Sequence, residues 1–172
     1  MDKTLLLLSG YPGVGKSYFS NMLLQHFSSL FLISQDEIIA KNFDLYGFSN
    51  IEEKEEVIEI SRRQFYRELE IGMQAHKTMV SDYHFTHDHQ SVIEVLTNKY
   101  EYKVITVRLL CDFEVLYKRQ TKAVEYSFKN FIEAGDNAGY NTFQIGQLIE
   151  LDTTKFDDAN HRQTIKYLSA IL

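Results

Sequence analysis

Residues Gly10-Tyr11-Pro12-Gly13-Val14-Gly15-Lys16-Ser17 lie between two segments of different apolar pattern. A continuous apolar run, Leu5 to Leu8, comes before them, and apolar residues at helical spacing follow them. Strand, tight loop and helix in this order are the setting in which the pattern G-x-x-x-x-G-K-[ST] indicates a phosphate-binding loop. We therefore expect an α/β fold that presents this loop to the phosphates of a nucleotide.

Each residue type in the stretch suits an anion. The three glycines allow positive φ, so that backbone N–H groups approach phosphate oxygens, and the following helix adds its own unpaired N–H groups. Lys16 can reach the β- and γ-phosphates, and the Ser17 hydroxyl can bind a magnesium ion. We expect the nucleotide to contact Gly10, Tyr11, Pro12, Gly13, Val14, Gly15, Lys16, Ser17 and Tyr18.

The glycines allow two other interpretations. One is a glycine-rich turn between a strand and a helix that binds nothing. The other is a dinucleotide fingerprint, which requires G-x-G-x-x-G. Here the glycines run G-x-x-G-x-G and Lys-Ser follows, which favours the phosphate-binding loop.

Composition narrows the class of protein. The 172 residues fit a single domain, and 44% hydrophobic with 24% charged residues are ordinary globular values. A net charge of −6 speaks against a protein that coats nucleic acid, and the single cysteine, Cys111, excludes an internal disulfide or a zinc cluster of cysteines. Without a leader-like or membrane-spanning apolar segment, we expect a cytoplasmic protein that binds no membrane.

The remaining chain alternates between strand and helix patterns. We expect strands over residues 3–9, 30–34, 78–81, 103–110 and 147–151. We expect helices over residues 16–29, 51–77, 87–99, 113–134 with a break, and 158–172, with Thr86 and Asp112 as N-caps. Gly135 is expected to end its helix and begin a polar loop over 135–146, and residues 37–50 show no clear pattern. The alternation predicts a parallel sheet with helices on both faces.

Acidic residues follow three of the expected strands, at the edge where ligands of such sheets bind. Asp36 is a candidate to accept the proton of an acceptor hydroxyl, with helix N-cap as the alternative. Asp82 is a candidate to hold magnesium, possibly through water, or to bind the acceptor; otherwise it is a turn residue. Asp152, with Thr153, is expected to shape the loop beneath the nucleotide base.

Histidines and basic residues offer further candidates. His84, His87 and His89 could bind a transition metal, although zinc ligands usually lie on rigid elements at i, i+3 or i, i+4, and His84 could instead contact the acceptor. Arg119 and Lys122 could neutralise the transferring phosphate, or belong to a solvated helix face. Five aromatic residues could either pack in the core or line an acceptor pocket: Phe43, Tyr46, Phe48, Phe65 and Tyr66.

Together these segments resemble the small P-loop kinases with a nucleoside-monophosphate-kinase-like fold. The likeness rests on "GYPGVGKS", "LISQDEI", and "MVSDYHFT" followed by "YKVITVRLLCDFEVLYKRQTK". Among these kinases the chain is most similar to the group of phage polynucleotide kinase, chloramphenicol phosphotransferase, gluconate and shikimate kinases and zeta toxins. The resemblance implies a three-layer P-loop NTPase fold with strand order 2-3-1-4-5, ATP with Mg²⁺ as cofactors, and transfer to a hydroxyl or phosphate acceptor.

By the same resemblance, Asp36 corresponds to the acceptor-activating aspartate, Asp82 to the strand-three aspartate and Arg119 to the first lid arginine. We expect residues 37–77 to bind the acceptor and residues 112–146 to form the lid, in which Lys122 and Ala123 stand where a second arginine is usual. The leading hypothesis is an ATP-dependent kinase of a small hydroxyl compound. A 5′-hydroxyl polynucleotide kinase and a regulatory NTPase without an acceptor are the alternatives.

Overall fold

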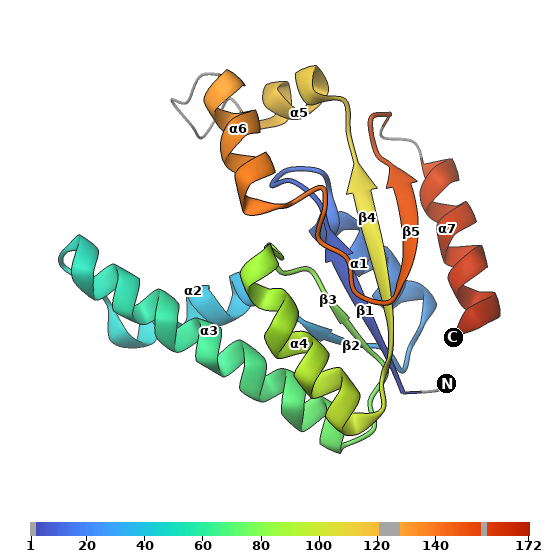
Figure 1. Ribbon diagram of the computed structural model, residues 1–172, viewed down its shortest axis with the longest axis horizontal. Coiled ribbons are helices and arrows are strands. Elements are labelled where there is room, and N and C mark those ends of the chain that lie inside the picture. The colour runs from blue at the N-terminus through green and yellow to red at the C-terminus, as the bar shows by residue number, and fades with distance from the viewer. Residues whose placement is uncertain (1–2, 121–127, 156–157) are drawn as a thin grey trace.

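The computed structural model describes residues 3–120, 128–155 and 158–172. Among them, five parallel strands form one sheet in the order β2-β3-β1-β4-β5, which confirms the expected fold class (Figure 1). In chain order the elements are β1 (Thr4–Ser9), α1 (Lys16–His26), β2 (Phe31–Ile33), α2 (Gln35–Tyr46), α3 (Ile51–Gln74), β3 (Met79–Ser81), α4 (His87–Tyr100), β4 (Lys103–Leu110), α5 (Phe113–Gln120), α6 (Phe128–Ala138), β5 (Gln147–Asp152) and α7 (Asp158–Ile171). None of the helices so bounded combines the length and apolar character needed to cross a membrane.

Strand β1 lies at the centre of the sheet, and all six of its residues are buried. Leu6 and Leu8 belong to the apolar core on the face covered by α1 and α7. Leu5 and Leu7 belong to the core on the opposite face, covered by α3 and α4 (Figure 1). A strand that is apolar at every position is therefore explained by burial on both sides, and its carboxyl end places the loop of residues 10–17 at the middle of the sheet edge.

Residues 35–46 form helix α2, although the sequence showed no clear pattern there. Ser34 is its N-cap, and the buried side of the helix carries Ile38 and Asn42. The Asn42 side-chain amide donates to Ser61 Oγ of α3 at 3.0 Å. An amphipathic helix is recognised in a sequence by its stripe of apolar residues. In α2 the polar residue Asn42 occupies part of that stripe, which explains why the sequence shows no clear helical pattern.

The expectation that Gly135 ends its helix and begins a polar loop is wrong. Helix α6 continues through Gly135 to Ala138. A Cβ atom at position 135 would lie 2.0 Å from Cε1 of Tyr11, so the glycine is there to admit the Tyr11 ring. The helix ends before Gly139, whose φ of +79° is the backbone conformation typical of a helix terminus.

Candidate active site

The loop between β1 and α1 has the backbone expected of a phosphate-binding loop. Gly10, Gly13 and Gly15 have φ angles of +125°, +82° and +99°. A Cβ at Gly10 would lie 2.4 Å from the carbonyl oxygen of Leu109, so a side chain is sterically excluded there. Gly15 is the N-cap of α1 and supplies no side-chain cap, which leaves the first amides of the helix available to an anion.

Lys16 is the buried cation of this loop. Its Nζ donates to the carbonyl oxygens of Gly10 at 2.9 Å and Tyr11 at 3.1 Å, and its side chain is 6% exposed. Burial lowers the pKa of Lys16 to about 8, against the opposing effect of the Asp82 and Asp36 carboxylates. The oxygens of a bound polyphosphate would stabilise the charged form of Lys16 over the neutral form, and the charged form is the one that attracts a nucleotide.

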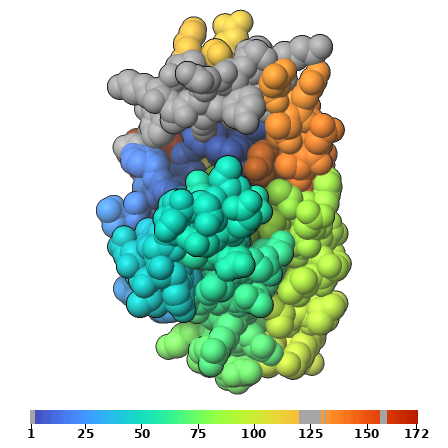
Figure 2. Space-filling view, turned by 90° about the vertical axis from the view of Figure 1, so that its left-hand side faces the viewer, coloured from blue at the N-terminus to red at the C-terminus, as the bar shows by residue number. Residues whose placement is uncertain are grey.

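A cavity of about 210 Å³ lies against the loop and brings most of the candidate residues together. It is lined by Gly13, Gly15, Lys16, Ser17, Tyr18, Asp36, Asp82 and His84. In Figure 2 the blue N-terminal segment is set back between the cyan and teal residues of α2 and α3 and the orange helix α6. Residues distant in sequence, at the start of α1, the start of α2 and the end of β3, therefore surround one small space.

Asp82 and Ser17 suit a magnesium site. Burial raises the pKa of Asp82, while hydrogen bonds from the hydroxyls of Ser17 and Ser34 act in the opposite direction. Carboxylate and hydroxyl oxygens are ligands that Mg²⁺ accepts together with phosphate oxygens, and a bound cation would favour the ionised carboxylate. Ser17 and Asp82 thus fit the metal that the fold family implies.

Ser34 is a member of this site that the sequence reasoning missed. Its hydroxyl is hydrogen-bonded to the Asp82 carboxylate. The expected strand order could have indicated this contact, because it makes β2 and β3 neighbours. Ile33 at the end of β2 pairs with Ser81 at the end of β3, so the residues that follow them, Ser34 and Asp82, lie side by side.

Asp36 occupies the first turn of α2 and lines the cavity. The alternative that it caps the helix is wrong, because Ser34 holds the N-cap position. His84 lines the same cavity, and burial together with the nearby Lys16 ammonium lowers the pKa of His84 to about 4. His84 is therefore a neutral hydrogen-bonding group at pH 7.

The other two histidines have structural partners. His89 Nδ1 accepts from the backbone N–H of Thr86 at 3.0 Å, and Thr86 is the N-cap of α4, as expected. His87 Nε2 lies 3.0 Å from Thr142 Oγ1. In the described part of the chain no three His, Cys, Asp or Glu side chains converge as a metal site would require.

Arg119 belongs to α5, and its guanidinium contacts the loop that follows β5. It is not among the residues that line the cavity. Its Nη2 donates to the carbonyl oxygens of Thr153 at 2.9 Å and Thr154 at 3.1 Å. Asp152 is the last residue of β5, and its Oδ1 accepts from the Thr154 N–H at 2.8 Å, which lowers the pKa of Asp152. These contacts shape the loop, whereas Lys122 lies outside the described residues.

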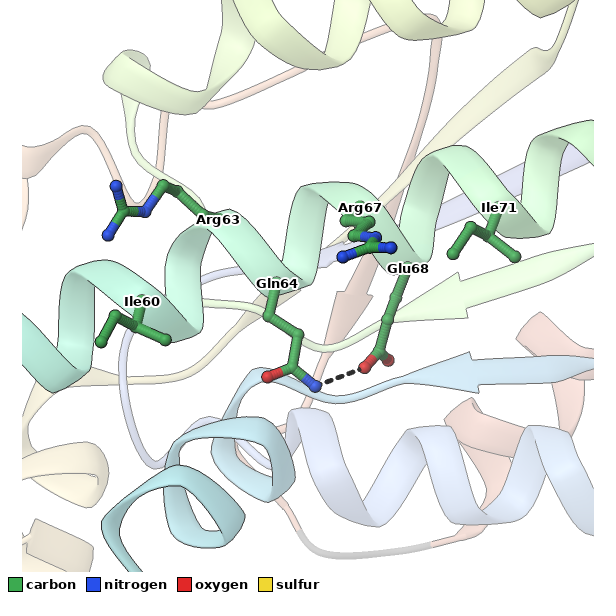
Figure 3. Close-up of a pocket in the computed structure, with 6 residues that line it drawn as sticks. All are labelled: Ile60, Arg63, Gln64, Arg67, Glu68 and Ile71. Atoms are coloured by element: carbon green, nitrogen blue, oxygen red, sulfur yellow. Dashed lines mark hydrogen bonds between the residues drawn. The ribbon is translucent and has the colours of Figure 1, made fainter. Parts of the chain in front are cut away.

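A second hollow, of about 480 Å³, lies along one face of α3 (Figure 3). It is lined by Ile60, Arg63, Gln64, Arg67, Glu68 and Ile71, and shares no lining residue with the cavity at the loop. Gln64 Nε2 donates to Glu68 Oε1 at 2.8 Å along this helix. A surface formed by one helix offers no convergent groups, so the chemistry points to the smaller cavity.

Two of the aromatic candidates, Phe65 and Tyr66, fit the core-packing interpretation. Phe65 is fully buried in the core formed with α3. Tyr46 and Phe48 are 58% and 46% exposed, and the Phe43 ring lies 4.9 Å from that of Phe48. Tyr66 is half-buried and packs against the same core as Phe65.

Three known structures that are similar to this chain are described as kinases. A candidate kinase of Chloroflexus aurantiacus J-10-fl is similar with a TM-score of 0.80 at 19% identity, covering 97% of this chain and 94% of that chain. A sugar kinase of Janibacter sp. HTCC2649 is similar with a TM-score of 0.60 at 16% identity, covering 96% of this chain and 94% of that chain. A shikimate kinase of Bacteroides thetaiotaomicron is similar with a TM-score of 0.62 at 14% identity, covering 98% of this chain and 97% of that chain. At these identities the likeness establishes the fold, and it confirms the resemblance to small P-loop kinases.

A sequence profile described as an AAA domain matches residues 5–134, which is more than half of the chain. The matched range includes the phosphate-binding loop, Asp36, Asp82, His84 and Arg119. The chain therefore belongs to this AAA domain family of P-loop proteins.

Proposed function

We propose that this protein is an ATP-dependent kinase that transfers the γ-phosphoryl group to a hydroxyl of a small molecule. The observation that carries the proposal is the cavity of about 210 Å³, which Lys16, Ser17, Asp36 and His84 line together. Donor-binding and acceptor-activating groups within one small space are what phosphoryl transfer requires. The descriptions of similar structures as a sugar kinase and a shikimate kinase support a small hydroxyl-bearing acceptor.

In the proposed reaction, the acceptor oxygen forms a bond to the γ-phosphorus while the bond to the β–γ bridging oxygen breaks. Asp36 accepts the proton of the acceptor hydroxyl, and Lys16 stabilises charge on the β- and γ-phosphates. Neutral His84 orients the acceptor by a hydrogen bond without adding charge. Magnesium, held by Ser17 and Asp82 directly or through water, would neutralise charge on the phosphates.

The assignment of regions follows from the same proposal. In this proposal the loop after β5, supported by Arg119 and Asp152, lies beneath the nucleotide base. Thr153 shapes that loop from within, because it is 1% exposed and its hydroxyl donates to the carbonyl oxygen of Leu110 at 2.9 Å. Residues 37–77 bind the acceptor, and residues 112–146 form the lid that contributes Lys122 to the donor phosphates. Arg119 reaches the same phosphates only when its guanidinium leaves the carbonyl oxygens of Thr153 and Thr154. We propose one domain over residues 1–172.

The test is ADP formation from ATP and magnesium, measured alone and with polyols, sugar acids, nucleosides and a 5′-hydroxyl oligonucleotide. We expect one class of small hydroxyl compound to accelerate ADP formation at least a hundredfold, with phosphorylated product. The same slow rate with every acceptor and with none would indicate a regulatory NTPase. Acceleration by the oligonucleotide alone would indicate a polynucleotide kinase.

Replacing Asp36 with Asn tests the acceptor side, because the amide keeps the shape and cannot accept the proton. We expect ATP affinity within about twofold of wild type and transfer slower by about 10² to 10⁴. Glu37→Gln is the matched control, since Glu37 is exposed on the same turn of α2 and pairs with Lys41 at 3.7 Å. Transfer by Asp36→Asn at the wild-type rate would remove Asp36 from the mechanism.

A further inference from the structure

The side chain of Tyr11 does not line the cavity at the phosphate-binding loop, although Tyr11 belongs to that loop. The ring is 1% exposed, and its hydroxyl donates to Asp136 Oδ1 at 2.6 Å and lies 3.1 Å from the carbonyl oxygen of Ile132. Both partners belong to α6. Burial and the Asp136 carboxylate raise the pKa of Tyr11, so its hydroxyl remains a donor at neutral pH.

The Tyr11 ring is also enclosed by apolar contacts. Gly135 lies so close that any Cβ there would collide with the ring. Phe113 of α5 and Tyr140, just beyond α6, meet the ring edge to face, with centroids 5.3 and 5.6 Å away. Packing on several sides gives the ring one position relative to α6.

The backbone of Tyr11 serves the other side of the site. Its carbonyl oxygen accepts from Lys16 Nζ at 3.1 Å and from the Val14 N–H at 3.3 Å. One residue therefore contacts α6 through its phenol and the phosphate-binding lysine through its carbonyl. Tyr11 therefore offers a direct connection between α6 and the loop, from its hydroxyl to its carbonyl oxygen.

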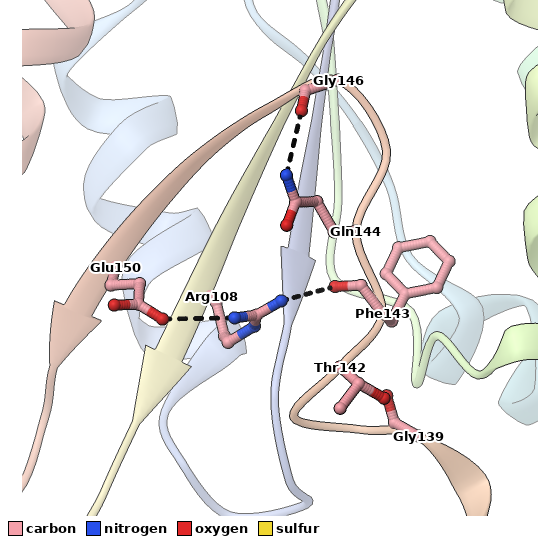
Figure 4. A network of polar contacts seen from close by, with 7 residues as sticks. All are labelled: Arg108, Gly139, Thr142, Phe143, Gln144, Gly146 and Glu150. Carbon is pink, nitrogen blue, oxygen red and sulfur yellow. Dashed lines mark hydrogen bonds and ion pairs between the residues drawn. The ribbon is translucent and has the colours of Figure 1, made fainter.

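The segment that follows α6 is held to the sheet by a separate network (Figure 4). Arg108 of β4 donates to the carbonyl oxygen of Phe143 at 3.3 Å and pairs with Glu150 of β5 at 3.2 Å. Thr142 Oγ1 donates to the carbonyl oxygen of Gly139 at 3.4 Å. Tyr11 adds contacts within α6 itself, at Ile132 and Asp136.

We propose that Tyr11 is a positioning residue that links α6 to the phosphate-binding loop, so that placement of α6 and binding of ATP are coupled. The inference rests on the proposed function, because it takes ATP as the ligand of the loop. Coupling of this kind is reciprocal: a contact that orders α6 strengthens ATP binding, and ATP in turn orders α6.

The test is a double-mutant cycle with Tyr11→Phe and Asp136→Ala, each of which removes the hydrogen bond between Tyr11 and Asp136 and keeps the aromatic ring at position 11. We expect each single variant to bind ATP about tenfold more weakly, as loss of a hydrogen bond to a charged group would cause, and the double variant to be no weaker than either. The KM for ATP should rise, while the KM for the acceptor stays unchanged. Tyr100→Phe is the matched control, because its hydroxyl donates to Glu70 at 2.7 Å elsewhere.

Amide hydrogen exchange over residues 132–138 provides a second readout that does not need turnover. Exchange should be faster in Tyr11→Phe than in wild type without nucleotide, and ATP should slow it in wild type. If wild type binds ATP and both single variants bind it equally well, the role of Tyr11 is overturned and the proposed function stands. If wild type binds no ATP, the proposed function and the coupling to ATP are both refuted. If exchange over residues 132–138 without nucleotide is the same in Tyr11→Phe as in wild type, the link between Tyr11 and α6 is refuted, whatever the ATP result.

Discussion

Lys16 keeps its ammonium group within the loop, against the carbonyl oxygens of Gly10 and Tyr11. Burial lowers the pKa of Lys16 to about 8 because the charged form loses its hydration, and Asp82 and Asp36 compensate for part of this loss. The folded protein therefore carries a cation that is stabilised less than it would be in water. Phosphate oxygens would supply the missing stabilisation, which favours binding of a polyanion at this position.

The pH dependence of stability should reveal this buried charge. The folded pKa of about 8 lies below the ordinary value of 10.5, so between these values the unfolded chain binds more protons and stability rises with pH. We expect the free energy of unfolding of wild type to gain on that of Lys16→Met by up to about 3 kcal/mol from pH 7 to pH 10.5. Urea unfolding of both proteins at pH 7, 8, 9 and 10 measures the gain, and parallel pH curves would contradict it.

At the scale of elements, α3 packs against β3 through Gly72. A Cβ at Gly72 would lie 2.3 Å from Sδ of Met79, and both residues are buried. Glycine weakens a helix, yet here it lets the helix approach the strand closely. The position of α3 relative to the sheet thus depends on a missing side chain.

Replacing Gly72 with Ala should destabilise the fold by about 1 to 3 kcal/mol, because overpacking outweighs the gain in helix propensity of about 1 kcal/mol. The double variant Gly72→Ala, Met79→Val should recover part of the loss, since valine lacks the sulfur atom that the new methyl group meets. Chemical denaturation of wild type and of all three variants, including Met79→Val, measures both effects. A single Gly72→Ala variant as stable as wild type would show that the Met79 side chain moves aside without cost.

At the scale of the whole molecule, the parallel sheet places the loop after β1, the start of α2 and the residues after β3 at one edge. A ligand that binds there contacts segments from the first half of the chain that are far apart in sequence. Such a ligand should stabilise the native state by mass action, because the unfolded chain has no such site.

Thermal unfolding with ATP and magnesium should therefore show a concentration-dependent rise in Tm. At a hundred times the Kd, binding contributes about 2.7 kcal/mol, which for a chain of this size raises the Tm by about 5 to 10 °C. Lys16→Met should show little or no shift, because it lacks the cation that meets the phosphates. A wild-type Tm that no nucleotide changes at millimolar concentration would contradict nucleotide binding.

Several features were determined by local sequence alone. The pattern of residues 10–17 predicted the glycine backbone and the helix start at Lys16, and the apolar run over 103–110 matched β4 at both ends. Thr86 is the N-cap of α4, and Asp112 Oδ1 accepts from the Glu114 N–H at 2.9 Å, as a cap would. These features depend on the conformational preferences and short-range hydrogen bonds of neighbouring residues, which the sequence shows directly.

Other features depended on contacts between distant segments. Helix α2 owes its buried side to Asn42 and its partner on α3, and Gly135 lies inside α6 because the Tyr11 ring occupies the space of a side chain. The guanidinium of Arg119 lies against the loop after β5, where backbone carbonyls receive it. In each case the deciding partner lies far away in the chain, so the energy that selects the conformation exists only when the tertiary structure has formed.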